Sequence, residues 1–388
     1  MRTNLSISNF NDVRKIVSVF FIFIGLALLL ISNSDHLMEK IIAGRSALNN
    51  SFGIHQFPGE DLVSISYLDN VKRFQDKDEF IFNKPVDDTG SRNIDLYIYG
   101  DSYLMEIPDS AFSSINSYHY CRRSYQDMNY SLNPHKKNIL IIEIAERFAR
   151  VEFELQETMR HFKKKQPEVS SLRLSGPSVI YAKFPDLDIF SPDVNRNLEF
   201  NLYGYRFWDQ VKFAKASLTY YLFKRAVGDA VVSDDGNRLF LKETMAENDR
   251  ASSYYPFEQK EIQKMFFNLN ATCAYYKADG FDEVYLSIIP NPVTILQPLH
   301  YNGLIPQLQQ PDSLKCMHII DMYDPFSKDP DPGRLFKTGD THWSNNGIQL
   351  WLKTVNAELK KQNLQAVSKR NSSGYGLSNL KKDTANHQ

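Results

Sequence analysis

The chain has 388 residues, of which 42% are hydrophobic and 23% are charged. These values are ordinary for globular proteins and exclude a mostly disordered chain, a collagen and a coiled-coil rod. The 45 basic and 46 acidic residues give a formal net charge of −1, so no global charge draws the protein to nucleic acid. The three cysteines, Cys121, Cys273 and Cys316, are too few for a disulfide scaffold, leave at least one thiol unpaired within the chain and fit no zinc motif.

An uncharged apolar run, IVSVFFIFIGLALLLIS, occupies residues 16–32. As a helix it is about 26 Å long, close to the hydrocarbon thickness of a bilayer. Arg14 and Lys15 precede it, so the positive-inside rule keeps residues 1–15 in the cytoplasm and exports the rest. No small-x-small cleavage site follows directly, which favours a single-pass signal anchor with the rest of the chain outside the cytoplasm. A cleaved signal peptide is the alternative.

The first exported segment, residues 33–90, is mixed and polar, and weak alternation at 62–68 (LVSISYL) and 79–83 (EFIFN) predicts a tether with edge elements. Beyond it the sequence predicts one domain over residues 91–360. Its first strand, 94–99 (IDLYIY), is short, rich in β-formers and runs straight into Gly100-Asp101-Ser102.

Further strands and helices alternate along this domain. Four prolines within residues 166–195 indicate a long connection or an insertion, and residues 361–388 read as a disordered polar tail. Predicted strands are 138–144, 283–289 and 318–321, and predicted helices are 207–227, 258–280 and 347–359. Alternation of this kind predicts an α/β fold, a three-layer α/β/α domain with a mainly parallel sheet, whose site lies at the carboxyl ends of the strands.

Ser102 lies where the first strand ends and a helix is expected to begin. Gly100 permits a tight turn there, and free backbone N–H groups at a helix start can stabilise an oxyanion. A serine alone is a weak nucleophile and needs a base oriented by a third group. By itself the short motif is more typical of an ordinary turn than of a catalytic serine.

The required base and orienting acid stand together near the C-terminus, in Gly339-Asp340-Thr341-His342-Trp343-Ser344. Asp340, two residues before His342 in a loop, can turn its carboxylate onto Nδ1 and leave Nε2 for the serine. Alone, this motif also suits a loop histidine beside a packing tryptophan. Together the two motifs favour a catalytic triad of Ser102, His342 and Asp340.

The motifs GDSY (100–103) and DTHW (340–343) resemble those of SGNH-like acyltransferases, in particular the periplasmic alginate O-acetyltransferase proteins. The resemblance spans roughly residues 94–360 and is dense only at short motifs. Those outside the triad are 141–148 (IIEIAERF), 235–241 (DGNRLFL), 288–291 (IIPN) and 319–321 (IID). In the alginate proteins the DxHW half comes first. Here the serine half comes first, as in ordinary SGNH hydrolases, which looks like a circular permutation. The usual Gly and Asn blocks of an SGNH oxyanion hole are not evident.

Five further residues are candidates for substrate or oxyanion contacts. Gly100 and Tyr103 flank the serine, and Tyr103 is a candidate for the acceptor site. Arg147 follows a strand end and could hold an oxyanion, with an ion pair to a neighbouring glutamate as the alternative. Asn291 could donate to an oxyanion or serve the turn between two prolines. Trp343 is expected to pack beside the triad rather than to form a sugar platform.

The resemblance implies an extracytoplasmic serine O-acyltransferase that acetylates a cell-surface or exported polysaccharide through an acyl-serine. With the predicted signal anchor, it implies a single-pass protein of a bacterial inner membrane whose catalytic domain is periplasmic. It implies no metal or bound cofactor. It also implies a partner, a membrane-bound O-acyltransferase that supplies the acyl group. The same triad would serve an SGNH carbohydrate esterase. A non-catalytic polysaccharide-binding or assembly protein is the alternative from another class.

Overall fold

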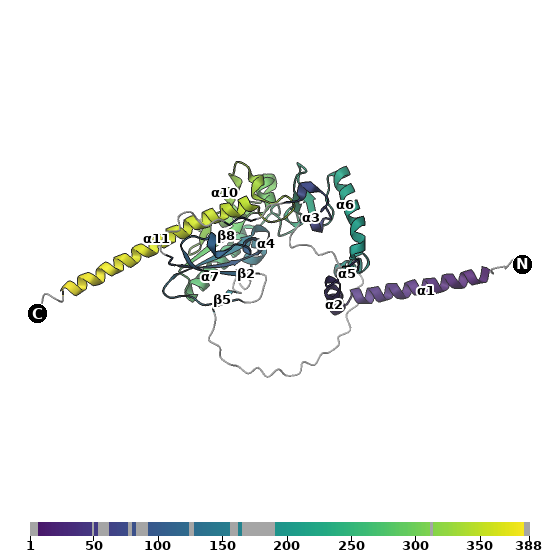
Figure 1. Cartoon of the computed structure of the whole chain (residues 1–388), viewed down its shortest axis with the longest axis horizontal. Helices are drawn as coiled ribbons and strands as arrows, with labels where there is room; N and C mark the ends of the chain where they lie inside the picture. The colour runs from purple at the N-terminus through teal and green to yellow at the C-terminus, as the bar shows by residue number, and fades with distance from the viewer. Residues whose placement is uncertain are drawn as a thin grey trace, which may run out of the picture. The chain divides into compact units, whose positions relative to one another are not determined.

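A computed structural model of the chain describes residues 7–48, 50–52, 62–76, 80–82, 92–123, 128–155, 162–164, 191–310 and 313–383. Side chains are described for these residues except 7–12, 128, 163–164 and 365–383. The backbone forms two compact units (Figure 1). The first comprises Met1–Gly59 and Ser170–Phe223, and the second comprises Glu60–Val169 and Lys224–Gln388.

The first unit is helical. Its elements are α1 (Ile7–Ser32), α2 (Asp35–Ser46), α5 (Pro192–Tyr203), the 3-10 turn η5 (Arg206–Trp208) and α6 (Asp209–Phe223). Within α1, the segment Val13–Ser32 has a mean hydropathy of 2.5 and is long and apolar enough to cross a membrane. A single such helix near an N-terminus also fits a signal sequence. Residues 35–46 of the predicted tether are therefore helical, with Ser34 as the N-cap of α2.

Polar contacts tie α5 to the end of α1 within this unit. The Asn197 side-chain amide donates to the Ser32 carbonyl at 2.9 Å, and that of Asn201 donates to Ser32 Oγ at 3.0 Å. The guanidinium of Arg45, on α2, lies 3.8 Å from the ring centroid of Tyr205, just after α5. The segment that ends the predicted insertion thus folds back onto the end of the apolar helix; residues 165–190 lie outside the described part of the chain.

The second unit is built on a five-stranded sheet in the order β2-β1-β4-β8-β9. Every neighbouring pair is parallel, which confirms the predicted α/β class. The strands are β1 (Ile94–Gly100), β2 (Ile115–Arg122), β4 (Lys137–Ala145), β8 (Glu283–Ile289) and β9 (His318–Ile320). All but β2 match predicted strands to within one residue at each end.

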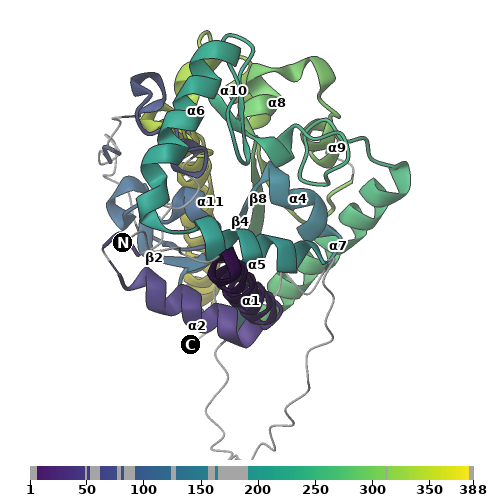
Figure 2. The ribbon, with the colours of Figure 1, turned by 90° about the vertical axis from the view of Figure 1, so that its right-hand side faces the viewer.

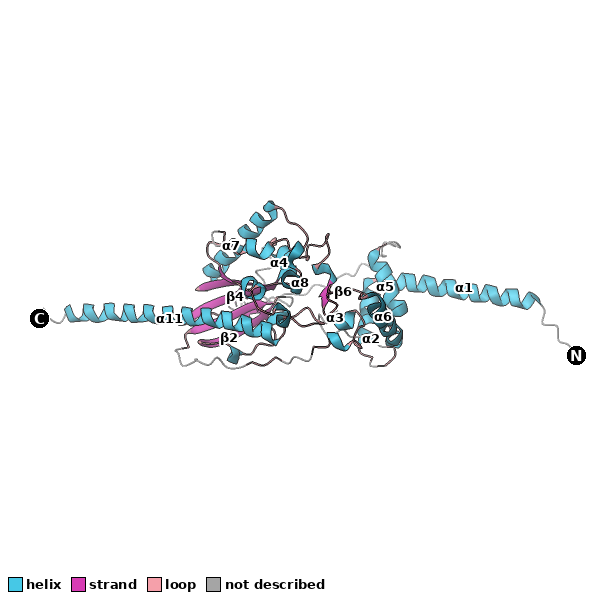
Figure 3. Ribbon diagram, turned by 90° about the horizontal axis from the view of Figure 1, so that it is seen from above, coloured by secondary structure: helices cyan, strands magenta, loops and turns pink. Residues whose placement is uncertain are grey.

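Helices cover both faces of this sheet (Figure 3). On one face Leu96 of β1 belongs to a core that includes Trp351 of α11 (Asn345–Asp383). On the other face Tyr97 belongs to a core with Leu269 of α7 (Gln259–Asp279) and Phe153 of α4 (Glu146–Phe153). Successive strand residues point to opposite faces, so a strand buried on both sides reads as a continuous apolar run.

Shorter elements complete the unit. They are α3 (Leu62–Ile65), η1 (Lys72–Phe74), η2 (Ser102–Leu104), η3 (Asp109–Ala111), β3 (Met128–Tyr130), β5 (Phe162–Lys164), β6 (Ala230–Val232), β7 (Leu239–Leu241), η6 (Lys242–Thr244), α8 (Pro292–Leu296), η7 (Pro298–His300), α9 (Leu304–Leu308), α10 (Tyr323–Ser327) and η8 (Pro332–Leu335). β3 pairs with β5 in parallel, and β6 with β7 in an antiparallel hairpin. The hairpin turns at Gly236, whose φ of 71° suits glycine.

Two predictions about local structure are wrong. Residues 62–65, expected as an edge element, form the helical turn α3, in which the Ser66 hydroxyl donates to the Leu62 carbonyl. The alternation there reflects a buried turn rather than a strand. The last helix does not end at residue 359 as predicted: the backbone continues α11 to Asp383, and no proline interrupts it.

Candidate active site

Ser102 begins η2, immediately after β1 and Asp101. The Asp101 carboxylate fixes this turn: Oδ1 accepts the Tyr103 N–H at 3.0 Å, and Oδ2 accepts the Ala145 N–H at 2.9 Å. The side chain of Asp101 therefore joins the end of β1 to the end of β4. Among the described residues no acceptor takes a hydrogen bond from the Ser102 N–H, so this group is available to a reacting oxygen.

Gly100 is needed for its small size rather than for its backbone freedom. Its φ is not positive, whereas a Cβ at this position would lie 2.6 Å from Glu143 Oε2. That same oxygen accepts the Asp101 N–H at 2.9 Å. Burial, with the negative charge of Asp101, raises the pKa of Glu143 well above its usual value. Gly100 is thus required because a buried glutamate packs against the serine turn.

The structure brings the three predicted triad side chains into one hydrogen-bonded chain. Ser102 Oγ lies 2.9 Å from His342 Nε2, and His342 Nδ1 lies 2.8 Å from Asp340 Oδ1. The same carboxylate oxygen accepts the His342 backbone N–H at 3.1 Å. Asp340 therefore holds both the ring and the backbone of the histidine, which is the geometry of a nucleophile, base and orienting acid.

The charge on Asp340 is secured by its surroundings. Burial alone would raise the pKa of Asp340, but the hydrogen bond from His342 and the charges of His342 and Lys337 lower it to about 2. Lys337 Nζ lies 3.5 Å from Asp340 Oδ2, the oxygen that His342 does not use. The carboxylate is thus ionised at neutral pH and favours the tautomer that carries its proton on Nδ1, leaving Nε2 to accept the serine proton.

The loop that carries the histidine, residues 336–343, is held from several sides. The Asp76 carboxylate accepts the backbone N–H groups of Thr338 and Gly339, both at 2.9 Å or less. From the other side the Tyr103 hydroxyl donates to the Thr341 carbonyl at 2.5 Å. Tyr103 also lies 4.7 Å from the His342 ring, centroid to centroid. The residue after the nucleophile therefore positions the base.

These contacts correct the role predicted for Tyr103. Its side chain is buried, so it does not line an open acceptor site. Trp343 is also buried and packs edge-on against Tyr103, with ring centroids 5.4 Å apart, as its predicted packing role requires. Arg147 is buried as well, and its Nη1 donates to the Tyr103 hydroxyl at 3.3 Å. Arg147 therefore holds Tyr103, which in turn positions His342. Its buried guanidinium does not face an open site in which it could contact an oxyanion.

Asn291 follows β8 as predicted, but its side chain is buried in a polar network. Its Nδ2 donates to Ser253 Oγ at 3.0 Å, and its backbone N–H donates to Glu146 Oε2 at 2.9 Å. The Thr294 hydroxyl donates to the same Glu146 oxygen at 2.5 Å. Burial raises the pKa of Glu146 to about 7, although these hydrogen bonds oppose the rise. The network joins α4 to α8, and the predicted oxyanion contact of Asn291 is not supported.

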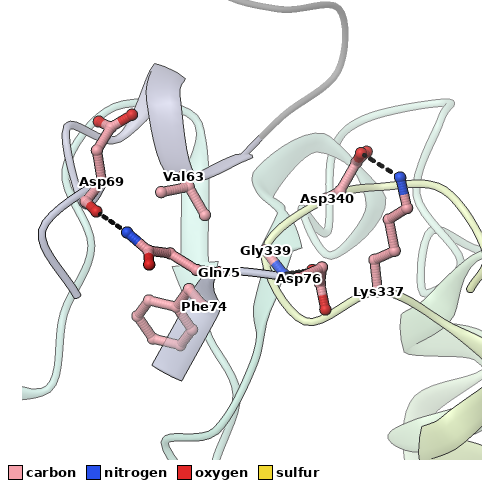
Figure 4. A pocket seen from close by; sticks show the side chains of 8 residues that line it. All are labelled: Val63, Asp69, Phe74, Gln75, Asp76, Lys337, Gly339 and Asp340. Carbon is pink, nitrogen blue, oxygen red and sulfur yellow. Dashed lines mark hydrogen bonds and ion pairs between the residues drawn. The ribbon is translucent and has the colours of Figure 1, made fainter. Parts of the chain in front are cut away.

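A pocket of about 270 Å³ opens beside the triad acid. Figure 4 shows Asp340 and Lys337 on one side of it and Asp69, Gln75 and Val63 on the other. Phe74, Asp76 and Gly339 complete the lining. Most of the lining side chains are polar or charged, so the pocket suits a hydrated, hydroxyl-rich group better than an acyl chain.

Sequence reasoning missed the residues that support the triad: Asp101, Glu143, Asp76 and Lys337. Asp101 carried a signal, because an aspartate one residue before a helical turn is a common N-cap. The roles of Glu143 and Asp76 depend on contacts between distant segments, for which the sequence holds no local signal. Within the described ranges, no group of three or more His, Cys, Asp or Glu side chains could hold a metal ion.

Comparison with known proteins gives no further assignment, since no family model, curated protein or solved structure matches this chain.

Proposed function

We propose that this protein is a membrane-anchored, extracytoplasmic serine O-acyltransferase that transfers an acyl group, acetyl in the first instance, to a polysaccharide hydroxyl. The observation that carries the proposal is the hydrogen-bonded chain Ser102–His342–Asp340, with distances of 2.9 and 2.8 Å. The resemblance of the two motifs to SGNH-like acyltransferases gives the reaction class. The apolar helix Val13–Ser32 is the candidate anchor.

In the first half-reaction Ser102 Oγ attacks the carbonyl carbon of the acyl donor. His342 Nε2 takes the serine proton as the C–O bond forms, and Asp340 stabilises the resulting imidazolium. The carbonyl oxygen becomes an oxyanion near the Ser102 N–H, one donor that no described residue occupies. When the intermediate collapses, the bond to the leaving group breaks, the imidazolium returns its proton to that group, and an acyl-serine remains.

The second half-reaction repeats these steps with a sugar hydroxyl as nucleophile. His342 removes the hydroxyl proton, the sugar oxygen attacks the acyl-serine, and the ester bond to Ser102 breaks as His342 reprotonates Oγ. The products are an O-acylated sugar and the free enzyme. The polar pocket beside Asp340 supports an acceptor of this chemistry, because carboxylate, amide and ammonium groups there can pair with sugar hydroxyls.

The proposed setting is a single-pass protein of a bacterial inner membrane with its catalytic unit in the periplasm. The acyl group would come from a membrane-bound O-acyltransferase partner, because the resemblance implies such a donor. The disulfide between Cys273 and Cys316, which joins α7 to the segment before β9, supports an oxidising compartment. The third cysteine, Cys121, is buried and free.

The test measures the consumption of an activated acetyl ester with and without an oligosaccharide acceptor. Mass spectrometry of the protein and the sugar then locates the acetyl group. We expect an acetyl adduct on Ser102 and acetylated oligosaccharide from the unaltered chain. Ser102→Ala should lose both, and Asp340→Asn should lower the rate by about 10⁴-fold because it favours the wrong tautomer of His342. The matched control is Ser117→Ala, which removes another serine that hydrogen-bonds a histidine, at 3.1 Å from His119.

The outcomes separate the rivals. Ester consumption that needs Ser102, with no modified sugar and with release of acetate from an acetylated polymer, would replace the transferase with a carbohydrate esterase. Equal behaviour of the unaltered chain and Ser102→Ala in every format would leave a binding or assembly protein. Loss of activity in Ser117→Ala to the same extent would show that the assay does not report on the triad.

A further inference from the structure

One face of α6 carries large apolar side chains that nothing within the described chain covers. Val211 is 58% exposed, Leu218 60%, Tyr221 61% and Leu222 63%. At 100° per residue these four lie within one sector of the helix, so they form a continuous stripe. We call this set the α6 stripe. A soluble helix normally turns such a stripe toward its core, and an exposed one marks an interaction surface.

The opposite side of α6 is already packed. Asp209, Ala216 and Tyr220 are buried, and they recur at helical spacing on the side away from the stripe. The α6 stripe is therefore not needed to pack α6 within its unit. Phe207 in η5 and Phe223 at the end of α6 add two more exposed aromatic rings, at 48% and 66%.

The candidate membrane helix α1 belongs to the same unit as α6, so the axis of α1 is a reference for the direction of α6. α6 runs across the axis of α1 in both Figure 1 and Figure 2. It follows α5 through η5, and α5 is hydrogen-bonded through Asn197 and Asn201 to Ser32, the last residue of α1. If α1 crosses the bilayer, its end at Ser32 lies at the membrane surface, and a helix that crosses its axis runs along that surface.

The charges around α6 also favour contact with a membrane surface. Residues 206–225 contain five basic residues and one acid, Asp209, which is buried; the basic ones are Arg206, Lys212, Lys215, Lys224 and Arg225. An apolar stripe with aromatic rings and flanking basic side chains is the pattern of helices that lie in the interface of a bilayer with anionic lipids.

We infer that α6 lies in the plane of the membrane, with the α6 stripe immersed at the level of the lipid headgroups and upper acyl chains. The occupant of the stripe is thus the lipid bilayer. The inference rests on the membrane anchor of the proposed function, but not on the acyl-transfer chemistry.

The experiment uses the full chain reconstituted in vesicles of phosphatidylcholine and phosphatidylglycerol, with no other protein present. Single cysteines introduced as Leu218→Cys or Tyr221→Cys carry an environment-sensitive fluorophore, and quenching by lipids brominated near the headgroup is measured. The matched control is Phe267→Cys on α7, where an apolar side chain of the second unit is 69% exposed. The unaltered chain gives the background, because its free thiol, Cys121, is buried. Phe20→Cys in α1 reports the anchor.

We expect at least a twofold greater loss of fluorescence at positions 218 and 221 than at 267. Quenching at 20 with none above the control at 218 and 221 would overturn the inference and leave the anchor intact. Absence of quenching at 20 would overturn the anchor and this inference together. Self-quenching between labels at 218, with no effect of brominated lipid, would assign the α6 stripe to a second copy of the chain and also overturn the inference.

Discussion

Replacing Gly100 with alanine tests how tightly the serine turn packs on β4. The added Cβ would lie 2.6 Å from Glu143 Oε2, 3.4 Å from Glu143 Cβ and 3.5 Å from Ile98 Cγ2. The first contact is about 0.8 Å shorter than an ordinary one, and Glu143 is buried, so neither side can move into solvent. Overpacking of this kind destabilises a protein by about 1 to 3 kcal/mol.

The same change should displace the nucleophile. Relief of the clash moves either Glu143 or the backbone of the turn, and the hydrogen bond from the Asp101 N–H to Glu143, 2.9 Å long, joins the two. A shift of about 1 Å at the serine lowers the rate of a positioned reaction by about 100-fold. We therefore expect Gly100→Ala to lower both the free energy of unfolding in urea and kcat/KM for an activated ester.

A double-mutant cycle identifies the contact responsible. Gly100→Ala should cost less stability in a Glu143→Ala background, because the atom it meets is gone. Gly44→Ala, at a helical glycine with nothing within 4 Å of a new Cβ, is the control; it should not destabilise the protein, and the higher helix propensity of alanine should add up to about 1 kcal/mol. Unchanged stability and activity in Gly100→Ala would refute the close-packing argument. An equal cost in both backgrounds would place the cause in the backbone rather than in Glu143.

Three further variants test other contacts. Tyr103→Phe removes the buried hydroxyl that donates to the Thr341 carbonyl, so we expect a loss of about 1 to 3 kcal/mol in urea unfolding and a lower kcat. An unaltered kcat would argue against a positioning role. The pKa of Glu146 is raised from 4.5 to about 7, so its contribution to stability is full below pH 4.5 and declines as pH rises to 7, by about 3 kcal/mol. Glu146→Gln should flatten this decline in unfolding measured across that range, and an undiminished slope would contradict the assignment. The pair Cys273→Ser and Cys316→Ser opens a link of sequence separation 43 and should cost about 4 kcal/mol, measured against the oxidised chain.

The central strands could be predicted because each is apolar on both faces. Residues 94–99 and 138–144 are nearly continuous apolar runs, which is the pattern of a parallel sheet covered by helices. β2 could not be found in the same way, because it lies at the sheet edge and its apolar run is interrupted by the polar residues Asn116, Ser117 and His119. Its polar side chains reflect exposure that depends on the tertiary fold.

The hydrogen-bonded triad could be predicted because its members stand at a strand end and in one short loop. The rule that sites lie at the carboxyl ends of parallel strands also correctly placed Arg147 and Asn291 at that edge of the sheet. It failed for their side chains, which turn inward to Tyr103 and Ser253, because a rule about backbone position does not give side-chain direction. Packing partners decide that direction, and they come from segments more than 30 residues away.

The separation of Ser102 and His342 along the chain determines when, during synthesis, their hydrogen bond can form. The two residues are 240 positions apart. At a synthesis rate of about 5 to 20 residues per second, the serine is made roughly 12 to 50 s before its base. The hydrogen bond between them therefore cannot form on a nascent or truncated chain. Because the apolar helix precedes Ser102 and Ser102 precedes His342, a nascent chain that already carries the apolar helix still holds an unactivated serine. The chemistry that we propose begins only when the segment that carries His342 has been made and has folded against Ser102.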